Sequence, residues 1–96
     1  MLESEFERYL LDDKNITSKV KAVATRMSKA RAVEETLKTS LDTIVSSDTR
    51  MHRALLEVNE KMKNHNGAYS NALRKYYIFK NHKVFPQIHA FERDNG

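Results

Sequence analysis

The sequence contains no cysteine, one proline and two glycines, and its longest apolar runs are only a few residues long. Without cysteine, the 96-residue chain can form neither a disulfide framework nor a thiolate metal site. Strands joined by short turns usually need more glycine and proline, so the composition predicts an all-α fold. The short apolar runs exclude a membrane-spanning helix. The first five residues lack the basic-then-apolar order of a signal peptide, so we expect a cytoplasmic protein.

The positive charges are concentrated in two stretches that contain no acid. The formal net charge is +4, from 17 Lys and Arg against 13 Asp and Glu. Residues 14–33 contain six basic residues, and residues 61–91 contain six more. A solvated helix normally mixes the two signs, because opposite charges one turn apart stabilise it. The two acid-free windows indicate a polarised surface that attracts polyanions, although a small basic protein can also carry such runs by chance.

Apolar spacing predicts a compact four-helix domain over residues 1–84. The first helix covers residues 3–12, and the second begins at Thr17 or Ser18 and weakens after residue 30. The stripe of the second helix is Ile16, Val20, Val23, Ala24, Met27 and Ala30.

The second half of the chain provides the other two helices. Residues 46–48 are expected to cap a helix over 49–63, and a fourth helix covers 68–81. Gly67 suits a turn with positive φ between them. Residues 37–48 are rich in Ser and Thr and predict a linker with a helical turn, whose apolar residues pack against the core. Residues 85–96 are expected to form an extension or a tail.

The sequence offers little support for catalysis or metal binding. It has no glycine-rich phosphate loop, no Gly-x-Ser-x-Gly elbow and no His-Glu-x-x-His motif. Its four histidines are separated by 13, 17 and 7 residues, not by the 3 or 4 that place two ligands on one helical face. We therefore expect a protein that is not an enzyme and that uses no metal or cofactor.

Polar residues at two expected helix starts coincide with the basic windows. Lys and Arg neutralise phosphates, and Ser, Thr or Asn at a helix start can donate to phosphate oxygens or reach a base edge. Residues 17–19 and 64–66 have this combination. Taken singly, each of these polar residues is adequately explained as a helix cap. Together with the two basic windows, they favour double-stranded DNA as the partner.

The order of these features resembles the N-terminal core-binding domain of tyrosine recombinases, the SAM-like domain of phage integrases. The resemblance covers about residues 6–84 and rests on "FERYLLDDKN", the polar turn "ITSKVKAV", the passage "SLDTIVSSD" and the closing helix "NALRKYYIF". It implies a DNA-binding half of a clamp, whose second and fourth helices lie across the major groove. It departs from the family at Val23, which is often aromatic there, and in the unusually polar turn at 64–67.

By position, the resemblance assigns two groups of residues to the DNA interface. From the second helix they are Ser18, Lys19, Lys21, Thr25 and Arg26. From the fourth they are Asn64, His65, Asn66, Ser70, Asn71, Arg74 and Lys75. Helical phase places Asn71, Arg74 and Lys75 on the outward face of that helix.

The sequence leaves two functional classes open. Full recombinases carry a second, catalytic domain, which this sequence lacks, so the resemblance implies either a fragment of a recombinase or a stand-alone relative. The first class is a non-catalytic DNA-binding domain, associated with the nucleoid when bound. The second is a small helical interaction protein, an inhibitor or adaptor from a mobile element, that engages another protein or a catalytic recombinase domain. Ile78, predicted to lie opposite the core stripe, supports the second class.

Overall fold

Over the residues that the structure describes, the chain forms helices joined by short connections, and no strand. The computed structural model describes residues 1–14, 16 and 19–95, with the backbone alone described at 65 and 95. The all-α prediction is confirmed, but this part of the chain holds six α-helices where four were predicted. They are α1 Glu3–Leu11, α2 Lys19–Leu37, α3 Leu41–Val45, α4 Asp48–Lys61, α5 Ala68–Asn81 and α6 Ile88–Asn95, with a short 3₁₀ turn, η1, at His65–Gly67.

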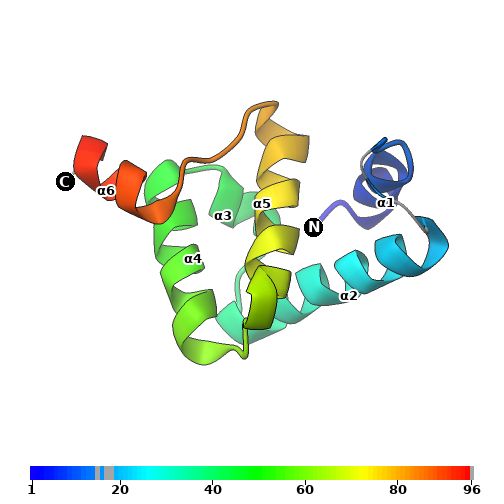
Figure 1. Cartoon of the computed structure of the whole chain (residues 1–96), viewed down its shortest axis with the longest axis horizontal. Helices are drawn as coiled ribbons and strands as arrows, with labels where there is room; N and C mark the ends of the chain where they lie inside the picture. The colour runs from blue at the N-terminus through cyan, green and yellow to red at the C-terminus, as the bar shows by residue number, and fades with distance from the viewer. Residues whose placement is uncertain (15, 17–18, 96) are drawn as a thin grey trace.

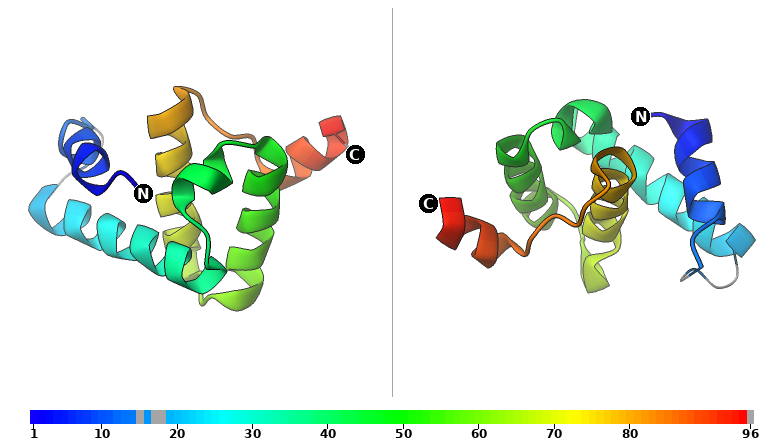
Figure 2. Two further views of the ribbon diagram at one scale, coloured as in Figure 1. Left: turned by 180° about the vertical axis from the view of Figure 1, so that it is seen from behind. Right: turned by 90° about the horizontal axis from the view of Figure 1, so that it is seen from above.

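Helix α5 lies at the centre of the fold. It packs against α1, α2, α3 and α4, and Figures 1 and 2 show it between α4 on one side and the α1–α2 pair on the other. Its buried residues are Ala72, Leu73, Tyr76 and Tyr77. Edge-on aromatic contacts extend this core, with Phe6 4.9 Å from Tyr76 and Phe85 5.1 Å from Tyr77 between ring centroids. The radius of gyration is 12.8 Å, close to the roughly 12.5 Å of a compact chain of this length.

The predicted bounds of three helices agree closely with the structure. The helix expected at 68–81 is α5, and those expected at 3–12 and 49–63 are α1 and α4, with ends that differ by at most two residues. The predicted cap of α4 is confirmed, because the Ser47 side chain accepts a hydrogen bond from the Arg50 N–H. Gly67 has the expected positive φ of 70°.

Helix α2 is longer than predicted, and its buried face is rotated. It continues to Leu37, and its buried residues are Val23, Met27, Ala30 and Val33. Val20 and Ala24, which were predicted to lie in the stripe, are exposed, Val20 to 85%. At 100° per residue both lie outside the arc of the buried four, Val20 by about 20° and Ala24 by about 60°, so the prediction was wrong for them. Figure 1 also shows the first turns of α2 lying beyond α5, below α1.

Two segments that were not predicted as full helices are helical. The expected linker contains α3, and its apolar residues Leu41, Ile44 and Val45 are buried as predicted. Ser40 caps this helix by accepting a hydrogen bond from the Thr43 N–H. The C-terminal extension contains α6, which packs on α4. His52 of α4 holds it, lying 3.0 Å from a Glu92 carboxylate oxygen.

Two tyrosine hydroxyls tie α5 to its neighbours. Tyr76 donates to Asp42 of α3 at 2.5 Å, and Tyr77 donates to Asp48 of α4 at 2.7 Å. Burial and the hydrogen bond to Asp42 raise the pKa of Tyr76. Burial and the hydrogen bond to Asp48 raise the pKa of Tyr77 to about 12. Both hydroxyls are thus held in their protonated, donating form.

Candidate nucleic-acid interface

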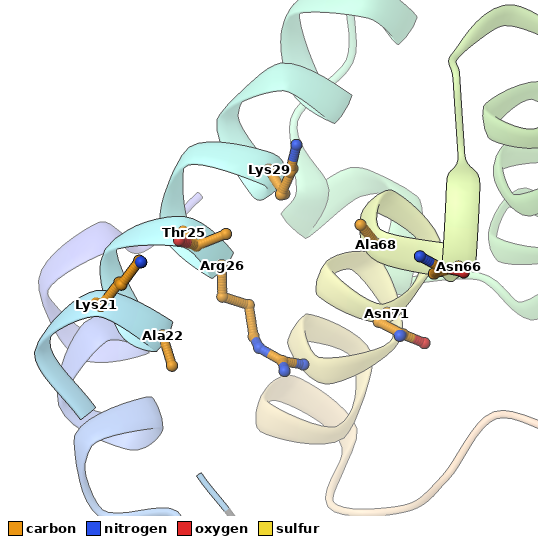
Figure 3. A pocket seen from close by; sticks show the side chains of 8 residues that line it. All are labelled: Lys21, Ala22, Thr25, Arg26, Lys29, Asn66, Ala68 and Asn71. Carbon is orange, nitrogen blue, oxygen red and sulfur yellow. The ribbon is translucent and has the colours of Figure 1, made fainter. Parts of the chain in front are cut away.

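A cleft of about 450 Å³ opens between α2 and the N-terminal end of α5 (Figure 3). We call it the α2/α5 cleft. Its lining residues are Lys21, Ala22, Thr25, Arg26, Lys29, Asn66, Ala68 and Asn71. Five of them, Lys21, Thr25, Arg26, Asn66 and Asn71, are among the twelve predicted interface residues. The structure therefore brings together residues from both predicted groups, although they lie forty or more positions apart in the sequence.

The α2 wall of the cleft is cationic. Lys21, Arg26 and Lys29 line it, and no acidic residue does. None of the three side chains forms an ion pair with the described part of the chain. Figure 3 shows Arg26 reaching across from α2 toward α5. A cation without an anionic partner in the protein keeps its charge available for an anion from solution.

Lys29 belongs to this wall but was not among the predicted interface residues. Its ammonium lies 4.5 Å from the centroid of the Tyr69 ring, so a cation–π contact holds it at the cleft. The sequence signal was present, because Lys21, Thr25 and Lys29 are spaced four residues apart and share one helical face. The family positions alone did not include it.

The α5 wall is neutral. It consists of Asn66, Ala68 and Asn71. Asn66 has a φ of 58° and Gly67 a φ of 70°, and these two left-handed residues turn the chain into α5. Asn66 and Asn71 are exposed, and their side-chain amides make no hydrogen bond to the described residues.

Asn64 and Ser70, both predicted to contact DNA, instead build the start of α5. The Asn64 Oδ1 accepts hydrogen bonds from the backbone N–H groups of Tyr69 and Ser70, at 2.9 and 3.2 Å. Its Nδ2 donates to Asn59 and to the Ser70 hydroxyl. That hydroxyl in turn donates to the Gly67 carbonyl at 3.1 Å. Their hydrogen-bonding groups are used to satisfy the first turn of the helix.

Arg74 was predicted to lie free on the outward face of α5, but its side chain is engaged within the protein. Its Nη1 donates to the backbone carbonyls of Phe85 and Pro86, at 2.9 and 3.2 Å. The guanidinium also lies 5.8 Å from the centroid of the Phe85 ring. Burial lowers the pKa of Arg74. The side chain anchors the segment between α5 and α6.

Lys75 and Lys19 are also engaged within the protein. The Lys75 ammonium lies 2.7 Å from a carboxylate oxygen of Asp13, and the two side chains are 25% and 10% exposed. The Lys19 ammonium donates to the backbone carbonyls of Leu11 and Asp13, at 2.6 and 2.8 Å. These lysines join the C-terminal end of α1 to α5 and α2. The outward, available placement predicted for Lys75 is corrected by this ion pair.

The remaining predicted residues are Ser18, His65 and Ile78. Ser18 lies outside the described residues, as does Thr17, its alternative as a helix cap. For His65 the backbone alone is described, in η1. Ile78, which was predicted to lie opposite the core stripe, is half-buried and lines a hollow with Tyr9 of α1.

Comparison with known proteins finds no family model, curated protein or solved structure that matches this chain. Within the described residues, no helix is both long enough and apolar enough to cross a membrane. The same residues contain no cluster of three or more His, Asp or Glu side chains that could hold a metal ion. What the α2/α5 cleft can bind is therefore inferred from the chemistry of the residues that line it.

Proposed function

We propose that this chain is a non-catalytic DNA-binding domain that grips duplex DNA with the α2/α5 cleft. The observation that carries the proposal is the cationic α2 wall, where Lys21, Arg26 and Lys29 have neither an acidic neighbour in the cleft nor an ion-pair partner among the described residues. Lys and Arg side chains that neutralise phosphates supply most of the affinity in sequence-independent DNA binding.

The position of the cleft also supports this proposal. Helix α5 is enclosed by α1 to α4, but its N-terminal end opens on the cleft and exposes Asn71. The major groove of B-DNA is about 12 Å wide, so this end of α5 can reach base edges while α2 follows the phosphates. The motif order shared with recombinase core-binding domains, in which a second and a last helix grip DNA, is consistent with this use.

A salt titration of duplex binding tests the proposal. Protein would be titrated into a labelled random-sequence duplex at several salt concentrations, with the complex followed by mobility shift or anisotropy. We expect affinity to fall steeply with salt, with a log–log slope of about −0.9 for each phosphate neutralised. The triple variant Lys21→Ala, Arg26→Ala, Lys29→Ala should lose most of the affinity and flatten the slope by about 0.9 for each contact removed.

The matched control removes three cations from elsewhere on the surface. Arg50, Arg53 and Lys63 are exposed and form no ion pair with the described residues. Their alanine variant has the same net charge as the triple cleft variant. Because it keeps the three cations of the cleft, it should retain a much larger part of the affinity. Equal losses in the two variants would make the binding a matter of net charge alone. Wild-type protein that leaves duplex unbound at low salt would contradict the proposal and favour the protein-interaction class.

A further inference from the structure

The two walls of the α2/α5 cleft offer different chemistry to a ligand. The α2 wall supplies three cations, whereas the α5 wall supplies two carboxamides and the methyl group of Ala68. Phosphate contacts fix the position of a protein on DNA but carry no sequence information, which is read from base edges. The neutral wall has the groups that read base edges, because an Asn amide pairs with adenine N6 and N7 and an alanine methyl packs against the thymine methyl group.

Asn71 is the side chain that α5 presents to the cleft in an exposed position. Within α5, only Asn71 and Lys80 are exposed, and Lys80 lies at the far end of the helix from the cleft. The Asn71 amide has no hydrogen bond to the described residues. The two neighbouring polar residues, Asn64 and Ser70, are by contrast committed to the start of the helix. The amide of Asn71 can thus offer both its donor and its acceptor to a ligand.

We infer that Asn71 reads an adenine in the major groove, with the carboxamide donating to N7 and accepting from the N6 amino group. This inference rests on the proposed function and adds to it a preference for an A·T pair at one position of the site. Lys21, Arg26 and Lys29 then contact the flanking phosphates from the opposite wall. Ala68, one helical turn before Asn71, lies where it can contact the methyl group of a thymine next to the read adenine.

Selection from a randomised duplex library tests the inference. The wild-type protein, Asn71→Ala, Asn71→Gln and a control, Gln87→Ala, would each be used to enrich bound duplexes for sequencing. Gln87 is an exposed amide outside the cleft. We expect the wild type and the control to favour A·T at one position by about tenfold. Asn71→Ala should lose that preference, so that it binds duplexes with and without the favoured A·T pair equally well. Asn71→Gln should keep part of the preference, because glutamine pairs with adenine in the same way.

The outcomes separate this inference from the proposed function. If the wild type binds duplex but shows no preference, or a preference that Asn71→Ala retains, the inference is overturned and the proposed function stands. A preference for another base that disappears in Asn71→Ala also overturns it. If the wild type binds no duplex at all, the proposed function fails, and the inference fails with it.

Discussion

The two basic windows of this chain contain similar residues but use them differently. In the first window, Lys21, Arg26 and Lys29 line a cleft and have no ionic partner among the described residues. In the second, Arg74 holds two backbone carbonyls and Lys75 is paired with Asp13. Charge density along a sequence therefore does not measure the charge available to a partner. What decides availability is whether a distant part of the fold supplies an anion or a carbonyl to each cation.

The strongest test of this difference is Arg74→Ala. Removing the guanidinium leaves the carbonyls of Phe85 and Pro86 without their donor and releases the segment that covers Tyr77. Hydrogen bonds to charged groups contribute about 1.5–3 kcal/mol each, but the bond to Pro86 is exposed to solvent and adds little, so we expect the free energy of unfolding to fall by about 2–3 kcal/mol. Chemical denaturation would measure the loss. Arg50→Ala, at an exposed arginine without an ion pair, should change stability by less than about 0.5 kcal/mol.

Duplex binding by Arg74→Ala and Arg26→Ala extends this comparison to DNA affinity. Measured where both proteins are folded, Arg74→Ala should bind DNA nearly as well as the wild type, whereas Arg26→Ala should bind more weakly. A stable Arg74→Ala variant with lost DNA affinity would return Arg74 to the interface, where the family resemblance had placed it.

Alkaline pH should lower the stability of the fold by deprotonating Tyr77. Its folded pKa is raised to about 12, while an unfolded tyrosine titrates near 10. The contribution of this group is fully present below pH 10 and is lost as the pH rises toward 12, because the unfolded state releases the proton more readily. Two pKa units at about 1.4 kcal/mol each make the full loss about 2.8 kcal/mol, of which about 2 kcal/mol is reached by pH 11.5.

Denaturation at pH 8 to 11.5 of the wild type and Tyr77→Phe would measure this contribution. The difference in stability between the two proteins should shrink as the pH rises. Tyr69→Phe is the matched control, because the Tyr69 hydroxyl makes no hydrogen bond to the described residues. A difference that is independent of pH would show that the Tyr77 hydroxyl is not held protonated by the fold.

The smallest effect is expected for Lys75→Met. This change breaks the ion pair with Asp13 but keeps the aliphatic stem, so we expect a loss of about 1 kcal/mol, reduced by added salt. Lys63→Met, at an exposed lysine without an ion pair, should have no measurable effect on stability. If Lys75→Met instead leaves stability unchanged and flattens the salt dependence of DNA binding, Lys75 belongs with the cleft cations.

Local pattern was sufficient to predict most helices of this fold and failed where tertiary contacts decide. The helix over 68–81 has a clear apolar stripe, a glycine before it and a proline after it, and its bounds are those of α5. Helix α3 lies in a Ser- and Thr-rich stretch of weak helix propensity, which the burial of Leu41, Ile44 and Val45 overrides. Helix α6 has few apolar residues of its own and is held by contacts with His52.

The sequence predicted which helices carry the candidate site, but not which of their cations are available to a partner. The position-by-position resemblance included Lys21, Thr25 and Arg26 of α2 and Asn71 of α5, and all four line the cleft. The partner of Lys75 lies 62 residues earlier in the chain, and those of Arg74 lie 11 and 12 residues later. No local pattern contains such contacts, so two cations that looked equivalent to those of α2 are structural residues.

The central position of α5 has a consequence for synthesis of the chain. α5 packs on each of the four helices that precede it, so it leaves the ribosome only after all four of them. Until residue 81 has emerged, the earlier helices lack their common apolar partner, and a nascent chain that stops before α5 should remain without a native core. Loss of α6, which packs on α4, should be tolerated far better. A premature stop before the 14-residue helix α5 should therefore prevent the core from forming, whereas a stop within α6 should not.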